Sequence, residues 1–126
     1  MTMLFMGSGK LVRNYDVLMK YFEKLRELGV DTSSCYPTGS DVEEVKSLAE
    51  RGEIKNLDDA VRFLVAKFRG RVNAVAAQQA VRDVMGIEVS PDAAVEYVAK
   101  LLALWTLEMC ESMGLIKIVG AEKYLR

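Results

Sequence analysis

The sequence predicts a mainly α-helical fold with about five helices and a C-terminal β-hairpin. Three observations support this prediction. Apolar residues recur at helical spacing through most of the chain, glycines and helix-capping residues separate these segments, and the last twelve residues change to a β-prone pattern. The chain has 126 residues, 51% of them hydrophobic and 28% charged, which is the composition of one globular domain with or without an appendage.

The first helix is predicted over about residues 10–28. Its apolar residues lie four, three, four and three positions apart, and Gly29 is a natural stop. The apolar residues 1–6 before it are expected to add a strand to a small sheet or to lie as an arm on a partner. Turn-forming residues follow in 31–39, so residues 1–39 are predicted to be an N-terminal arm, helix and connector.

The second and third helices are predicted mainly from their ends. Ser40 and Glu43 have the spacing of a capping box, and Gly52 ends the second helix. Asn56 is expected to cap the third helix, over residues 57–69. Both helices belong to a helical domain predicted to span residues 40–126.

The fourth and fifth helices are also marked by their ends. Asn73 is expected to cap the fourth helix, which Gly86 terminates. Ser90 followed by Pro91 is a specific start signal for the fifth helix, predicted over residues 91–113. The apolar stripe of that helix is the strongest in the chain and comprises Ala94, Val98, Leu101, Leu102, Trp105 and Met109.

The last twelve residues are predicted to form a β-hairpin. Residues 115–119 are β-prone, Gly120-Ala121 fits a type II′ turn, and residues 122–126 form the returning strand. A lone hairpin is marginally stable in water. It is therefore expected to pack on the helices or to accept Leu4–Met6 as a third strand.

The composition argues against catalysis and against a membrane span. Histidine is absent, which excludes Ser-His-Asp and Cys-His catalysis and removes the imidazole ligands of a zinc site. Cys35 and Cys110 have no metal-ligand spacing. No apolar run is long enough to cross a bilayer. We therefore expect no enzyme activity, no metal and no cofactor, and a cytoplasmic location.

The order of elements in residues 57–126 carries a resemblance. Three helices are followed by a hairpin, with Gly86-Ile87 and Ser90-Pro91 at the turn between the last two helices. In this order the segment resembles the winged helix-turn-helix family of DNA-binding proteins. The resemblance implies that the fifth helix enters the major groove through its early exposed residues, which are Ser90, Asp92, Ala93, Glu96, Tyr97 and Lys100.

Basic and amide side chains near the third and fourth helices are candidates for nucleic-acid contact. Arg, Lys, Asn and Gln are the side chains that hydrogen-bond phosphates and base edges. Alternatively, these residues merely favour helix ends and keep the surface soluble. The predicted nucleic-acid-binding residues, including those of the recognition helix and the wing, are Lys67, Arg69, Arg71, Asn73, Gln78, Gln79, Arg82, Lys100, Lys117 and Lys123.

The first helix is predicted to mediate dimerisation, because the domain core is not expected to cover all of its apolar residues. The predicted interface comprises Tyr15, Leu18, Tyr21, Phe22 and Leu25. The function expected from these observations is that of a small dimeric DNA-binding protein, a prokaryotic or archaeal-viral transcription regulator.

Two alternatives to a regulator stay open. One is a nucleic-acid-coating or assembly subunit, such as a filamentous virus coat protein (which would place it in a virion) or a small subunit of an RNA-guided effector complex. The other is a winged-helix module that docks a protein. Asp92 and Glu96 favour this last alternative, because both are acidic and would face phosphates in a DNA complex.

Overall fold

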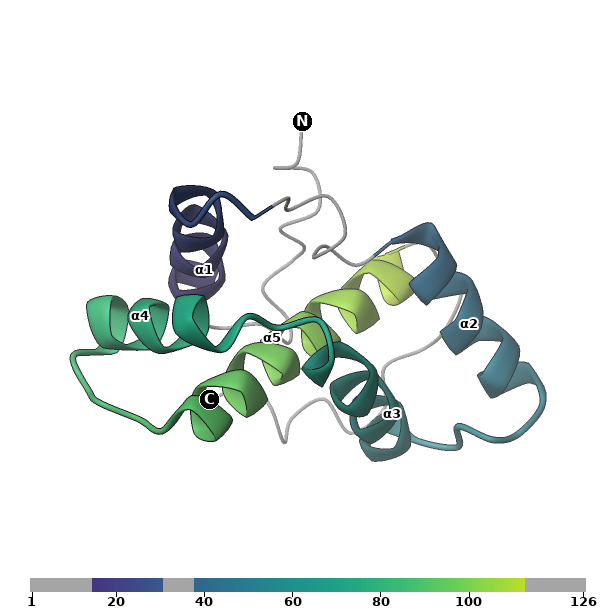
Figure 1. Ribbon diagram of the computed structural model, residues 1–126. Coiled ribbons are helices and arrows are strands. Elements are labelled where there is room, and N and C mark those ends of the chain that lie inside the picture. Colours follow the sequence, from purple (N-terminus) through teal and green to yellow (C-terminus); the bar gives the residue numbers. More distant parts are fainter. Residues whose placement is uncertain (1–14, 31–37, 113–126) are drawn as a thin grey trace.

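The computed structural model describes residues 15–30 and 38–112, and helices make up most of this part (Figure 1). These ranges confirm the mainly helical prediction and contain no strand. The predicted hairpin of residues 115–126 and the predicted strand at Leu4–Met6 lie outside the described residues. The helices are α1 (Tyr15–Glu27), α2 (Gly39–Glu50), α3 (Leu57–Arg69), α4 (Ala74–Met85) and α5 (Pro91–Ser112).

Helix α5 is the centre of the fold. All four other helices pack against it, α3 and α4 most extensively (Figure 1). Every residue from Leu101 to Glu108 is buried. The sequence predicted one apolar stripe on this helix, but the buried surface is wider than that stripe. A helix that is apolar on all sides is covered on all sides. None of the described helices is long and apolar enough to cross a membrane.

Helix α1 packs along α4 and reaches α5 (Figure 1). The ring of Phe22 lies 6.2 Å from that of Trp105, centroid to centroid. The hydroxyl of Tyr21 accepts a hydrogen bond from the backbone N–H of Asn73 at 3.0 Å. These contacts fix α1 both to the start of α4 and to the middle of α5.

The residues predicted to form a dimer interface lie largely inside the chain's own core. Leu18, Tyr21, Phe22 and Leu25 are at most 5% exposed, and Tyr15 is partly buried. The prediction assumed that the domain could not cover this stripe, but α4 and α5 cover it. Dimerisation stays a prediction, and it requires another surface.

Three of the predicted helix caps are confirmed. The side-chain oxygens of Asn56, Asn73 and Ser90 each accept a hydrogen bond from the backbone N–H three residues later, at 2.9, 3.0 and 3.1 Å. Gly86 ends α4 in a left-handed conformation, with φ of 70°, which glycine adopts without the steric cost of a Cβ.

The start of α2 differs from the prediction. The N-cap is Thr38, not Ser40, and its partner in the capping box is Asp41, not Glu43. The Thr38 hydroxyl accepts from the Asp41 N–H at 3.2 Å, and the Asp41 carboxylate accepts from the Thr38 N–H at 2.8 Å. Asp41, and not Glu43, takes this position because its carboxylate also binds Lys67 on α3.

Truncation of a buried side chain on α5 should show how much this helix contributes to the free energy of unfolding. Leu102 is 1% exposed, so Leu102→Ala leaves a cavity and should lower the free energy of unfolding by about 2–5 kcal/mol. Val75→Ala, at a position that is 51% exposed, should change it by less than about 0.5 kcal/mol. Urea unfolding followed by the fluorescence of Trp105, the single tryptophan, measures both variants. Equal losses would contradict the central position of α5.

Candidate functional site

Asp41 is the buried centre of an ionic cluster that joins α2 to the end of α3. Its side chain is 1% exposed. Arg71 binds it through two guanidinium nitrogens, at 3.0 and 2.9 Å, and the Lys67 ammonium lies 2.9 Å away. Lys67 also contacts Glu44. Two of the cations predicted to bind phosphate are therefore engaged in holding helices together.

The charged state of Asp41 is strongly favoured. Burial alone would raise the pKa of this carboxyl group, but hydrogen bonds from Arg71, Lys67 and the Thr38 backbone outweigh burial and hold the pKa well below its usual range. Because Arg71 and Lys67 neutralise a permanent buried charge, a phosphate group would have to compete with a carboxylate that is already bound by both cations.

Arg69 and Arg82, also predicted to bind phosphate, have weaker partners. Arg69 lies 3.4 Å from Glu96, and Arg82 lies 3.7 Å from Glu88. All four side chains are about half exposed or more. Ion pairs of this kind contribute little to stability because water screens them, so both arginines remain accessible to a binding partner.

The remaining predicted residues fall into three groups. Asn73 caps α4, and the Gln78 amide donates a hydrogen bond to the Val89 carbonyl at 3.0 Å, which fixes the turn between α4 and α5. Gln79 is partly buried and Lys100 is exposed on α5. Lys117 and Lys123 lie outside the described residues.

Among the described side chains of α5, those of its early part include most of the exposed ones. Ser90, Asp92, Ala93, Glu96 and Lys100 are exposed, as the winged-helix resemblance implies, whereas Tyr97 is partly buried. The rest of the described helix is almost wholly buried. Any contact that α5 makes with a partner therefore involves its first turns, where two acidic residues precede a single lysine.

Two large apolar side chains are exposed next to this end of α5. Met85 is 42% exposed and Ile87 is 47% exposed. They flank Gly86, where the chain leaves α4. We call this region the α4–α5 turn surface, which comprises Met85, Ile87, Glu88, Asp92 and Glu96.

No pattern in the sequence reveals the α4–α5 turn surface. Met85 follows the helical spacing of the apolar face of α4, yet it lies in the last turn, beyond the part of α4 that packs on its neighbours. Ile87 gives no signal of exposure in the sequence either, because an apolar residue just after a helix-ending glycine usually packs back on the helix. Here it remains half exposed.

The charge of the described part of the chain is negative. Residues 15–30 and 38–112 contain twelve basic and sixteen acidic side chains. Nucleic-acid binding draws most of its affinity from cations that neutralise phosphates. The described helices therefore carry no overall excess of positive charge, and nucleic-acid binding there would need a local basic patch.

The interior holds no activated nucleophile among the described cysteines. Cys110 is fully buried, and burial raises the pKa of its thiol to about 11, so the reactive thiolate is disfavoured. The Tyr15 hydroxyl donates a hydrogen bond to the Glu108 carboxylate at 2.7 Å, and burial together with this bond raises the tyrosine pKa. Within residues 15–30 and 38–112, no three His, Cys, Asp or Glu side chains are placed to hold a metal ion.

Neutralising Asp41 should destabilise the fold. Asp41→Asn leaves Arg71 and Lys67 without their shared counter-charge and should lower the free energy of unfolding at pH 7 by about 3 kcal/mol. Asp92→Asn removes the same charge at an exposed position and should change stability by less than about 0.5 kcal/mol. Chemical denaturation of the three proteins tests this, and equal stabilities would show that the cluster is not structural.

The same variant should change how stability depends on pH. The pKa of Asp41 is lower in the folded chain than in the unfolded chain, so its contribution is complete above the unfolded value of about 3.9 and is lost as the pH falls toward the folded value. The difference in stability between the wild type and Asp41→Asn should therefore shrink below about pH 4. A difference that stays constant from pH 7 to pH 3 would contradict this assignment.

Comparisons with known proteins add no family to this description. No protein-family model matches the chain, and neither do any curated protein or solved structure. The candidate surfaces above therefore stand on their own geometry.

Proposed function

We propose that the chain is a non-catalytic binding protein that docks a protein partner through the α4–α5 turn surface. The observation that carries this proposal is the exposure of Met85 and Ile87 next to the acidic residues Glu88 and Asp92. Exposed apolar groups with a polar rim are typical of protein-binding sites.

The turn is well suited to present these side chains. The Gly86 conformation ends α4 abruptly, the Ser90 side chain caps α5, and the Gln78 amide holds the Val89 carbonyl between them. A loop fixed at both ends loses little conformational entropy when it binds. Ile87 and Met85 are therefore presented from a defined backbone.

The rim predicts the chemistry of the partner. Glu88 directly follows Ile87, and Asp92 and Glu96 are exposed in the first two turns of α5. Two of these carboxylates pair with exposed arginines, Glu96 with Arg69 and Glu88 with Arg82. A partner segment with apolar anchors and flanking Lys or Arg residues would bury the apolar groups and find complementary charge. The proposal is thus a docking module for a basic, amphipathic protein segment.

DNA binding is the second candidate, and it has one specific observation in its favour. Arg69 and Arg82 are about half exposed on α3 and α4, each with an exposed glutamate as its partner, and Lys100 is exposed on α5. Against it, Glu96 and Glu88 lie beside the two arginines and would face the phosphates. Protein docking uses both the acidic and the apolar side chains of this region, which DNA binding leaves unexplained.

Selection from a displayed library of random peptides tests the docking proposal. We expect enriched peptides to be basic with apolar anchors, and Ile87→Asp to weaken their binding at least about tenfold because a charge replaces the apolar anchor. Val75→Asp is the matched control, since Val75 is equally exposed at the other end of α4, and it should bind as the wild type does. Equal loss in both variants, or no enrichment, would refute the proposal.

A DNA-binding measurement on the wild type distinguishes protein docking from DNA binding. Titration of a fluorescent DNA duplex at two salt concentrations should give no salt-dependent binding if the surface docks protein. Strong binding that falls with salt and with Arg69→Ala and Arg82→Ala would favour DNA instead.

A further inference from the structure

We infer that the outer face of α1 is an interface between two copies of this chain, in which the two α1 helices lie antiparallel across a twofold axis. The outer face of α1 comprises Asp16, Met19, Lys20, Glu23 and Arg26, which lie opposite the stripe buried against α4 and α5. This surface is separate from the α4–α5 turn surface, so the inference does not depend on the proposed docking function.

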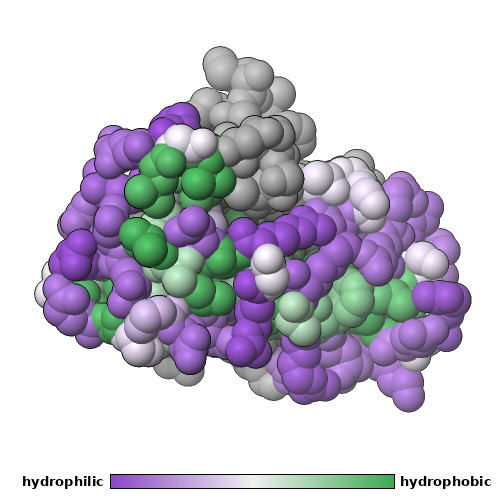
Figure 2. Space-filling model, in the orientation of Figure 1, coloured by the Kyte–Doolittle hydropathy of each residue, from purple (hydrophilic) through white to green (hydrophobic). Residues whose placement is uncertain are grey.

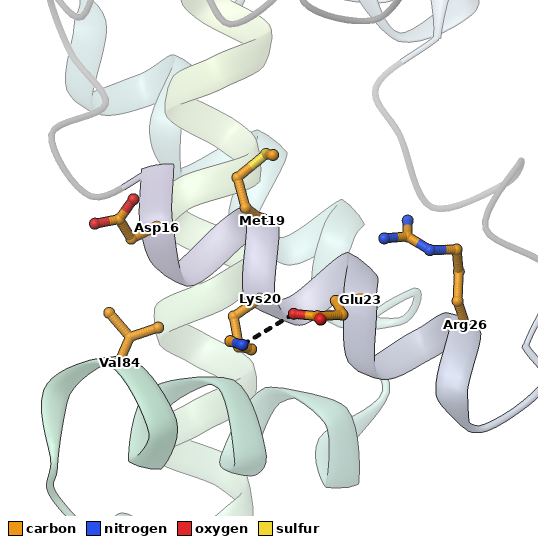
Figure 3. Close-up of a pocket in the computed structure, with 6 residues that line it drawn as sticks. All are labelled: Asp16, Met19, Lys20, Glu23, Arg26 and Val84. Atoms are coloured by element: carbon orange, nitrogen blue, oxygen red, sulfur yellow. Dashed lines mark ion pairs between the residues drawn. The ribbon is translucent and has the colours of Figure 1, made fainter.

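A shallow groove runs along this face. The five residues of the outer face and Val84 of α4 line it (Figure 3). Met19 is 49% exposed and Val84 is partly buried, so two apolar side chains line the groove besides the charged ones. Apolar surface lies over α1 and along its junction with α4 (Figure 2).

The order of charges on this face is self-complementary. Along α1 the face carries negative, positive, negative and positive groups at Asp16, Lys20, Glu23 and Arg26. Reversing this order exchanges the signs at every position. In an antiparallel pair centred near Tyr21, Asp16 therefore faces Arg26 of the second copy, and Lys20 lies near Glu23 of the second copy. A parallel pair in register would bring like charges together.

Twofold symmetry doubles each of these contacts. In an isologous interface, each residue that meets a different residue across the axis does so twice. Met19 of each copy lies between the charged positions and is covered by the opposing helix. A second copy of the same face thus complements the charged positions and covers the exposed Met19.

Little must be broken within one chain to form this pair. Lys20 contacts Glu23 on the same helix at 2.9 Å, but both side chains are at least one-third exposed, and exposed pairs of this spacing contribute little. Lys24, at the edge of the face, contacts Asp83 at 3.0 Å and Glu27 at 3.6 Å and keeps these partners. Two helices of thirteen residues offer less than a standard interface, so we expect a weak dimer that high salt dissociates.

A charge-swap experiment tests the inference. Sedimentation velocity of the full chain over a range of concentrations should show a monomer–dimer equilibrium that weakens at high salt. Asp16→Lys and Arg26→Asp should each weaken it at least about tenfold, because each places two pairs of like charges across the axis. The double variant Asp16→Lys/Arg26→Asp should restore dimerisation, since positions 16 and 26 of opposing copies again carry opposite charges.

Matched controls come from an exposed ion pair that lies just after α2 and outside the outer face of α1. Arg51 and Glu53 lie 3.5 Å apart and are both about 60% exposed. Arg51→Asp and Glu53→Lys change the net charge as Arg26→Asp and Asp16→Lys do, and they should leave the equilibrium unchanged. Circular dichroism confirms that each variant is folded.

Three results would overturn the inference. They are a wild type that remains monomeric at millimolar concentration and low salt, a dimer insensitive to the single charge reversals, and a double variant that fails to regain dimerisation. Ile87→Asp should dimerise as the wild type does, so failure of the docking proposal and failure of this inference are distinguishable.

Discussion

Helix α5 can be buried along its length only if other helices cover every side of it. Leu101 to Glu108 include no exposed residue, so no two-layer arrangement would satisfy this segment. α3 and α4 cover it most extensively, and α1 and α2 complete the enclosure. The apolar stripe of each surrounding helix therefore faces α5. Only a few large apolar side chains of the described residues stay exposed, and these are the ones that a binding partner could bury.

The same enclosure explains how the charged residues are used. α2 has fewer contacts with α5 than α3 or α4 has, and the Asp41 cluster adds a second attachment between α2 and the end of α3. A buried carboxylate requires charged hydrogen-bond donors, and Arg71 and Lys67 supply them. The basic segment that suggested phosphate binding thus includes two residues whose partner is inside the protein.

The sequence predicted the helices well and the ionic cluster not at all. Asn56, Asn73, Ser90 and Gly86 act locally, so their positions alone identified three helix starts and one helix end. The partnership of Asp41 with Arg71 spans thirty residues, and no local pattern reveals it. The spacing of Thr38 and Asp41 did contain the capping box, but Ser40 and Glu43 offered a competing one.

The burial of α1 shows a different limit of sequence reasoning. Its stripe was correctly recognised as apolar, but periodicity does not say whether a helix of the same chain or of another copy covers it. Tyr21 shows why helices of the same chain cover this stripe, since its hydroxyl accepts a hydrogen bond from the Asn73 N–H at the start of α4. Likewise, the apolar stripe predicted for α5 did not indicate how much of this helix is core.

The exposed apolar residues lie mainly on one side of this arrangement. Among the described residues, the large hydrophobic side chains that remain exposed are Met19, Leu28, Val75, Met85 and Ile87. All of them lie on α1, on α4 or directly after these helices, which pack against each other. Near α2 and α3, by contrast, ion pairs close the surface around Asp41. Because exposed apolar area is what association removes from water, the side formed by α1 and α4 is where binding would gain most free energy. A dimer through α1 and a partner at the end of α4 would use different residues of this side.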